Sequence, residues 1–162
     1  MRRLKTTAFV AAVLIASAAA GVALAQKPAD HVAIQASEMK WGAAPPSLPP
    51  GAEAVVLDGD PTKAAPFTVR LKFPDGYKVP PHWHPTDERV VVLSGTLSLG
   101  VGEKGDTSKM HSLTAGAFAK MPKDVRHYVA AKGATVIQVY GTGPFEVNYV
   151  NPNDDPRKKK TE

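Results

Sequence analysis

The chain has 162 residues, a formal net charge of +5 and no cysteine. The absence of cysteine excludes disulfides and thiolate metal sites, so any metal site must use His, Asp or Glu side chains. The positive charge belongs mainly to the two ends, because three basic residues precede residue 6 and four occupy positions 157–160. The stretch between these ends is nearly balanced in charge, which disfavours a nucleic-acid-binding surface.

The first 25 residues have the order of a secretory signal peptide. Arg2, Arg3 and Lys5 precede an apolar run over residues 8–16, and small residues then lead to Ala23-Leu24-Ala25, an A-x-A cleavage pattern. A membrane anchor is the alternative, but the strongly apolar stretch is shorter than the ~20 residues that a bilayer span needs. We therefore expect cleavage after residue 25, export to the periplasm or the medium, and no membrane attachment of the mature chain.

The remainder divides by composition into an arm, a domain and a tail. Residues 26–54 are rich in Ala and Pro and include the proline-rich run 45–50, a composition that excludes a regular helix or a central strand. We expect an extended arm over residues 26–54, one domain over residues 55–150, and a disordered charged tail over residues 151–162.

The pattern of the domain is that of a series of short strands. Residues 67–73 alternate apolar and polar side chains, which is the period of a half-buried strand. Ser94-Gly95 lies between the apolar runs 89–93 and 96–101, which indicates a hairpin. Other short apolar runs, separated by Gly, Pro or Asp, are 55–57, 110–113, 117–121, 126–131, 135–140 and 145–150. Short strands at this spacing, without an amphipathic helix, predict an all-β antiparallel sandwich or barrel.

Three histidines and one glutamate occupy positions that favour a metal site. His82 and His84 are two residues apart beside a strand pattern, and such residues in an extended chain point to the same face, about 6.5–7 Å apart at Cα. Imidazoles at this separation can converge on one ion. Glu88, in the following strand, is an even number of residues from both histidines, so its carboxylate can face the same interior. His127 lies among apolar neighbours, where an unpaired imidazole is unfavourable. The alternative is two loop histidines and one hydrogen-bonded core histidine.

The spacing of these residues resembles the two sequence motifs of the cupin superfamily. The first motif is matched at every fixed position by Gly76-x5-His82-x-His84-x3-Glu88-x6-Gly95, and the second is resembled by Gly116-x5-Pro122-x-Asp124-x2-His127. Two positions depart from the second motif. Asp124 stands where Gly is usual, and Asp tolerates a left-handed turn better than most residues. Ala131 stands where Asn is usual, and that position is not a metal ligand in the family.

The resemblance implies a jelly-roll barrel in a small, single-domain, exported cupin of the type-2 kind. A looser likeness is to the cupin half of anti-sigma sensors. In the family the four matching positions bind one divalent metal ion, which gives His82, His84, Glu88 and His127 as the ligands here. The metal can be Fe, Mn, Ni, Cu or Zn, and one or two coordination positions are left for water or substrate. Glu88 is also the candidate catalytic base, since no other carboxylate or histidine with suitable parity accompanies the ligands.

Two functions follow from such a site, both with a small-molecule ligand. The first is a metal-dependent oxygenase or lyase that acts on an enol or diketone; the second is a non-catalytic binding or sensing module. Gln138 and Tyr140 share a face of a late strand and are candidates for the pocket or the core. Val91 and Leu93 point away from the face of Glu88, which makes a homodimer through this face a further expectation.

Overall fold

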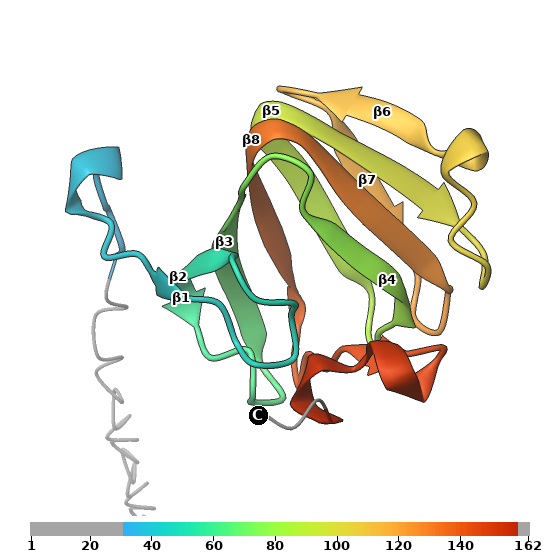
Figure 1. Ribbon diagram of the computed structural model, residues 1–162. Coiled ribbons are helices and arrows are strands. Elements are labelled where there is room, and N and C mark those ends of the chain that lie inside the picture. The colour runs from blue at the N-terminus through green and yellow to red at the C-terminus, as the bar shows by residue number, and fades with distance from the viewer. Residues whose placement is uncertain (1–30, 159–162) are drawn as a thin grey trace, which may run out of the picture. The chain divides into compact units, whose positions relative to one another are not determined.

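The computed structural model describes residues 31–158, and this range contains nine strands and no α-helix (Figure 1). The strands are β1 Gly42–Ala43, β2 Glu53–Gly59, β3 Pro66–Phe73, β4 Lys78–Trp83, β5 Glu88–Val101, β6 His111–Thr114, β7 Phe118–Met121, β8 His127–Thr142 and β9 Asn148–Tyr149. Four 3₁₀ helices accompany them: η1 Ala36–Glu38, η2 Thr107–Lys109, η3 Pro152–Asp154 and η4 Pro156–Lys158. All strand pairs are antiparallel, so the expected all-β antiparallel architecture is confirmed.

Nothing in the described range could cross a membrane as a helix, since no helix there is long and apolar enough. The expected signal peptide, residues 1–25, lies outside the described residues.

Strands β5 and β8 connect two sheets that curl around a common interior (Figure 1). Residues 135–142 of β8 pair with β3 and with the first half of β5, which gives the sheet β1-β2-β3-β8-β5-β7. Residues 127–130 of β8 pair with β4, and the first part of β8 also pairs with the second half of β5, which gives the sheet β9-β4-β8-β5-β6. This is the arrangement of a jelly-roll barrel.

The expected hairpin at Ser94-Gly95 was wrong, because β5 continues through these residues. The register between β5 and β8 shifts between Val92 and Ser94 and again between Ser94 and Thr96, where β5 passes from one sheet to the other. Gly95 has φ +74°, and a Cβ there would lie 2.4 Å from the carbonyl oxygen of Ala134 in β8. The glycine therefore allows a bend against the neighbouring strand, which is how a β-bulge turns a corner between sheets.

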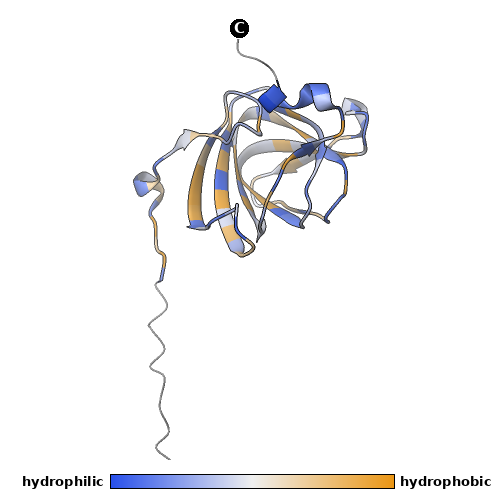
Figure 2. Cartoon of the chain, turned by 90° about the horizontal axis from the view of Figure 1, so that it is seen from below, coloured by the Kyte–Doolittle hydropathy of each residue, from blue (hydrophilic) through white to orange (hydrophobic). Residues whose placement is uncertain are grey.

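The two sheets enclose apolar side chains that alternate along the strands, and Figure 2 shows this as bands of hydrophobic and hydrophilic residues. Phe67 and Phe73, at either end of the alternating run in β3, are 2% and 3% exposed, which confirms the half-buried strand. Ala131, at the usual Asn position, is buried, and its backbone bonds Gly76 and Tyr77 in the turn before β4. Ala at this position therefore leaves the backbone hydrogen bonds to the turn before β4 intact.

A disordered tail was expected from residue 151 onward. As far as residue 158, the chain after β9 is instead ordered. It forms η3 and η4, and the carboxylate of Asp155 is buried against the guanidinium of Arg157. Arg157 Nε donates to Asp155 Oδ1 at 2.8 Å, and Nη2 donates to the carbonyl oxygen of Val147 at 2.9 Å. These bonds tie the segment to the chain that precedes β9. Residues 159–162 of the expected tail lie outside the described range.

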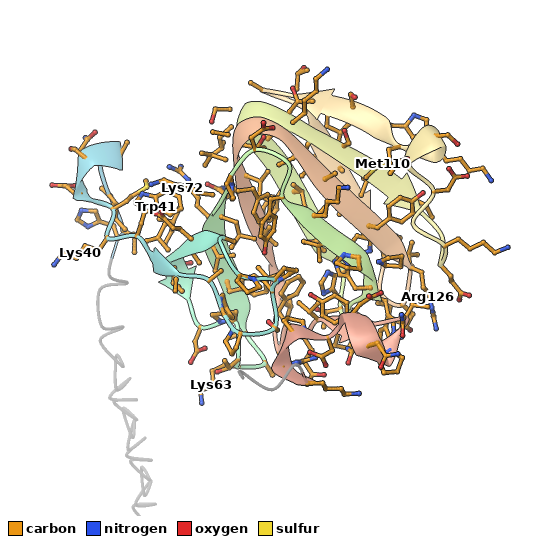
Figure 3. The ribbon with its side chains drawn as sticks, in the orientation of Figure 1. Lys40, Trp41, Lys63, Lys72, Met110 and Arg126 are labelled. Carbon is orange, nitrogen blue, oxygen red and sulfur yellow. The ribbon has the colours of Figure 1, made fainter. Side chains whose placement is uncertain are left out.

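The proline-rich arm is bonded to the barrel at several points. Strand β1 pairs with β2, and the side chain of Lys72 lies over the ring of Trp41, 3.9 Å from its centroid (Figure 3). Farther along, the hydroxyl of Tyr77 donates to the carbonyl oxygen of Pro49 at 2.6 Å, and that of Tyr149 donates to Ser47 at 2.8 Å. The arm is thus fixed to both sheets by side chains that lie far from it in sequence.

Candidate metal centre and its cavity

The four predicted ligands lie at strand ends that meet at one end of the barrel. His82 is in β4, His84 follows that strand, Glu88 begins β5 and His127 begins β8. His82 and His127 are direct partners in the β4–β8 ladder. The two motifs, which are 39 residues apart between Glu88 and His127, are therefore brought together by strand register.

The three histidines form a buried cluster. His82, His84 and His127 are 5%, 3% and 1% exposed, and their candidate ligand nitrogens all lie within 4.8 Å of one another. The rings of His82 and His127 are 4.2 Å apart at their centroids. Imidazoles this close and this buried can bind one metal ion.

His82 and His127 are oriented by their own backbones. Nδ1 of His82 bonds the carbonyl oxygen of Pro80 at 2.7 Å, and Nδ1 of His127 bonds that of Val125 at 3.0 Å. A carbonyl oxygen only accepts, so the proton of each neutral ring lies on Nδ1. Each Nε2 is left with a lone pair, and this second bond is the usual means of fixing a metal-binding histidine.

His84 is oriented instead by the segment that precedes β9. Its Nδ1 bonds the carbonyl oxygen of Glu146 at 2.6 Å, and its ring stacks on Phe145 with centroids 4.2 Å apart. The next carbonyl, that of Val147, is the one that accepts from Arg157. The third imidazole therefore depends on residues about 60 positions away in the sequence, which include part of the expected tail.

Glu88 lies beside the imidazoles with its carboxylate directed at them. Oε2 is 3.2 Å from Nε2 of His127 and 3.5 Å from Nε2 of His84. Burial raises the pKa of Glu88, but the nearby imidazoles of His84 and His127 outweigh burial and hold this pKa below its usual range. Burial and the neighbouring His127 lower the pKa of His82 to about 3, so this ring is neutral, as a metal ligand must be.

The donor set fits a divalent transition metal. Nε2 of His84 is buried and has no hydrogen-bond partner within residues 31–158, although an unpaired buried polar atom is costly. Three imidazole nitrogens and a carboxylate oxygen are suitable ligands for Mn, Fe, Ni, Cu or Zn. The three buried histidines could therefore bind a metal ion, and the carboxylate of Glu88 lies beside them.

A cavity of about 310 Å³ adjoins this cluster. Its polar lining residues, within the described chain, are the three histidines, Glu88, Ser47 and Thr62. The other lining residues are apolar and come from the arm, from both sheets and from the segment before β9; they include Leu48, Val56, Phe67, Leu99, Met121, Ile137, Phe145 and Val147. The arrangement is that of a small-molecule pocket with one polar, metal-binding end.

Other sequence candidates lie away from this cavity. Gln138 does not line it and accepts a hydrogen bond from Arg70 Nε at 3.0 Å. Tyr140 is also absent from the described lining, and the other two histidines of the chain, His31 and His111, are exposed. Val91 is half-buried and Leu93 is 38% exposed.

Sequence reasoning missed the wall that the arm contributes. Pro45, Ser47 and Leu48 line the cavity, although their composition predicted only an extended arm. It also missed Phe145 and the backbone of Glu146, which orient His84. No local signal marks these positions, because their role depends on contacts with distant parts of the chain.

Comparison with solved structures shows the cupin fold. RemF, a polyketide cyclase from Streptomyces resistomycificus, superposes with a TM-score of 0.61 at 17% identity, over 78% of this chain and 90% of that one. A proposed acetylacetone dioxygenase from Methylibium petroleiphilum PM1 has a TM-score of 0.61 at 17% identity, over 81% and 88%. An RmlC-like cupin from Shewanella frigidimarina NCIMB 400 has a TM-score of 0.55 at 16% identity, over 72% and 94%.

Comparison by sequence gives a family but no individual relative. No curated protein matches the chain. A family model matches residues 32–160, which is most of the chain and includes every described residue except His31. The chain has the cupin fold and belongs to the family described as "Domain of unknown function (DUF4437)".

Proposed function

We propose that the protein is a metal-dependent oxygenase or lyase that acts on a small enol or diketone. The observation that carries this proposal is the cluster of three imidazoles with Nδ1 bound to carbonyl oxygens, at the polar end of an apolar cavity. In the proposal, His82, His84, Glu88 and His127 hold one divalent ion. Such an ion supplies polarisation of a substrate oxygen and, when redox-active, chemistry with dioxygen.

The substrate class follows from the two ends of the cavity. An enol or 1,3-diketone presents oxygen atoms at one end and an apolar body at the other, which matches a polar ligand cluster in an otherwise apolar lining. Acetylacetone, named in one of the similar structures, is such a diketone, although that likeness is one of fold at 17% identity. The lining therefore orients the substrate by burial of its apolar part, with its oxygens toward the histidines.

Glu88 is the proposed proton acceptor. It is the one carboxylate among the described lining residues, and Oε2 faces the space that the histidines share. A diketone must lose the proton between its carbonyls to become an enolate, and this proton would pass to the carboxylate of Glu88. Glu88 would leave the ligand set as it becomes a carboxylic acid, and the three imidazoles would still hold the ion. Oε2 lies 3.2 Å from Nε2 of His127 and 3.5 Å from Nε2 of His84, so the carboxylate is already beside the imidazoles before the transfer.

Oxygen uptake tests this proposal. The purified protein would be loaded separately with Fe, Mn, Ni, Cu or Zn, and oxygen consumption would be followed with acetylacetone and a panel of enols and diketones. We expect uptake with at least one redox-active metal and none with Zn. If no compound of the panel is consumed or cleaved by any metal form, the enzymatic proposal is wrong.

Non-catalytic ligand binding or sensing is the second candidate. It is favoured by one observation: within residues 31–158, no histidine or carboxylate other than the proposed ligands lines the cavity, so no separate proton relay is present. Tight binding of a diketone by the metal-loaded protein, without turnover, would support this candidate.

We further propose that the protein is exported to the periplasm or the medium after cleavage at residue 25. The support is the basic, apolar and small-residue order of the first 25 residues. Cell fractionation followed by N-terminal sequencing should find a mature chain that starts at Gln26. A full-length chain in the cytoplasm or the membrane would contradict export with cleavage.

A further inference from the structure

The proline-rich part of the arm is a wall of the ligand cavity. Pro45, Ser47 and Leu48 line the cavity together with residues of both sheets. Leu48 is half-buried, and its backbone N–H bonds the carbonyl oxygen of Pro45 at 2.9 Å, which closes a tight turn. This turn presents the Leu48 side chain to the same space that the metal-binding cluster faces.

Two tyrosines hold this wall in place from opposite ends of the domain sequence. Tyr77 lies before β4 and donates to Pro49, and Tyr149 lies in β9 and donates to Ser47. Burial raises the pKa of Tyr77 to about 12, so its hydroxyl stays a donor at physiological pH. The wall therefore has a defined position with respect to β4 and β9, whose residues His82 and Tyr149 are register partners.

The exposed members of the lining mark where the cavity opens. Pro45 and Thr62 are exposed, and Val56 is 51% exposed, whereas the histidines at the other end of the lining are buried. Pro45 comes from the arm, Val56 from β2 and Thr62 from the turn that follows β2. The entrance thus lies between the arm and this turn, and none of its three residues is charged.

The interior offers no partner for a charge on the body of a ligand. Within the described chain, the titratable side chains of the lining are Glu88 and the three histidines, all at the metal-binding end, and no Lys or Arg lines the cavity. An anionic group away from the metal-binding end would lose its hydration without gaining a counter-charge, which is strongly unfavourable. An uncharged apolar body gains free energy from the same burial.

We infer that the arm segment 45–50 determines specificity: Leu48 contacts the ligand body, entry passes Pro45, Val56 and Thr62, and the cavity accepts uncharged apolar molecules while rejecting those with an anionic body. This inference rests on the proposed function only for the chelating end of the ligand. The apolar wall acts with or without a metal, so it can be tested on the metal-free protein.

A matched pair of fluorescent probes tests the selection. Purified protein treated with a chelator would be titrated with 1-naphthol and with 5-hydroxynaphthalene-1-sulfonate, which share the hydroxyl-bearing ring system and differ by one anionic group on the body. We expect 1-naphthol to bind at least about 10-fold more tightly, because the sulfonate must be desolvated without a partner. Equal affinities, or no binding of 1-naphthol to either the metal-free or the metal-loaded protein, would overturn the inference.

Two variants locate the binding at the arm and the entrance. Leu48→Trp fills the cavity from the arm, and Thr62→Trp narrows the entrance at an exposed side chain whose one hydrogen bond is to Asp60. We expect each to weaken 1-naphthol binding at least about 10-fold. Lys63→Trp is the matched control, since Lys63 is exposed beside Thr62 but does not line the cavity, and it should bind as the unchanged protein does.

The outcomes separate this inference from the proposed function. Unchanged 1-naphthol affinity in both Leu48→Trp and Thr62→Trp would refute the role of the arm, whatever the metal does. If the protein binds 1-naphthol more tightly than the sulfonate but consumes no diketone, the inference stands and only the enzymatic proposal is removed.

Discussion

The two ends of the cavity are built in different ways. At the metal-binding end, His82 and His127 are positioned by strand register and by carbonyl oxygens two residues before each of them. At the other end, the wall formed by Pro45, Ser47 and Leu48 is held by hydroxyl groups of tyrosines far away in the sequence. The first end depends mainly on backbone pairing within the sheet, and the second on single bonds from side chains.

This difference teaches how each end should respond to change. A metal ion needs several ligands at once, so loss of two imidazoles should abolish binding rather than weaken it. An apolar wall acts through buried area, and its contribution changes gradually with the size of each side chain. Variants at the first end should therefore show large effects on metal content, and variants that act from a distance should show smaller ones.

The largest effect is expected from the double variant His82→Ala with His84→Ala. Removal of two of three imidazoles should leave no bound metal after purification, as measured by elemental analysis. Thermal unfolding should also occur at a lower temperature, because the metal stabilises only the folded state. His111→Ala is the control, since His111 is exposed and outside the cluster. Normal metal content in the double variant would show that the site is elsewhere.

Glu88→Gln should separate metal binding from turnover. The amide keeps the shape of the side chain but cannot accept the substrate proton, so we expect oxygen uptake to fall by roughly 10²- to 10⁴-fold, the usual value of a general base. The three imidazoles should still retain metal. Glu103→Gln provides a matched change at an exposed carboxylate. Full activity of Glu88→Gln would remove this residue from the reaction.

The sequence was sufficient to predict the features that depend on local spacing. The alternation in residues 67–73 identified β3, and the two-residue spacing of His82 and His84 predicted that both side chains lie on the same face, where both are buried. Asp124 was expected to tolerate a left-handed turn where Gly is usual, and it has such a conformation, with φ 64°. Each of these features is set by a few consecutive residues, so its signal is visible in the sequence.

Features that depend on distant contacts could not be predicted in the same way. Gly95 signals a tight bend, but only its proximity to β8 makes the bend a bulge within one strand instead of a hairpin. The charged residues after position 150 suggested disorder, yet Arg157 finds a buried carboxylate and the carbonyl oxygen of Val147. In both cases the deciding partner lies elsewhere in the chain.

Arg157→Ala should give an intermediate effect that reaches the metal from a distance. Without its bond to Val147, the backbone at Glu146 should hold His84 less firmly, and loss of such a second bond to a ligand typically weakens metal binding. We expect about a 3- to 10-fold rise in the metal dissociation constant, below the roughly 10- to 100-fold found when the direct partner is lost.

Competition with a chelating dye would measure this dissociation constant. Lys158→Ala, at the neighbouring exposed residue, should leave it unchanged. The spectrum of the Co-substituted protein adds a readout that general destabilisation does not move, since it reports the geometry of the ligands. An unaltered spectrum and dissociation constant in Arg157→Ala would mean that η4 has no influence on His84.

The smallest effect is expected at Asp124, in the turn that leads to His127. Its φ of 64° is one that a β-branched residue adopts only at a cost, so Asp124→Val should lower the free energy of unfolding by about 1–2 kcal/mol. Asp124→Gly should change it by less than about 1 kcal/mol, because relief of strain in the folded chain is offset by the greater freedom of the unfolded chain. Urea denaturation of the metal-free protein would measure both values. A Val variant as stable as the Gly variant would show that this turn can change conformation, and in that case metal affinity should fall as well, because His127 follows the turn by three residues.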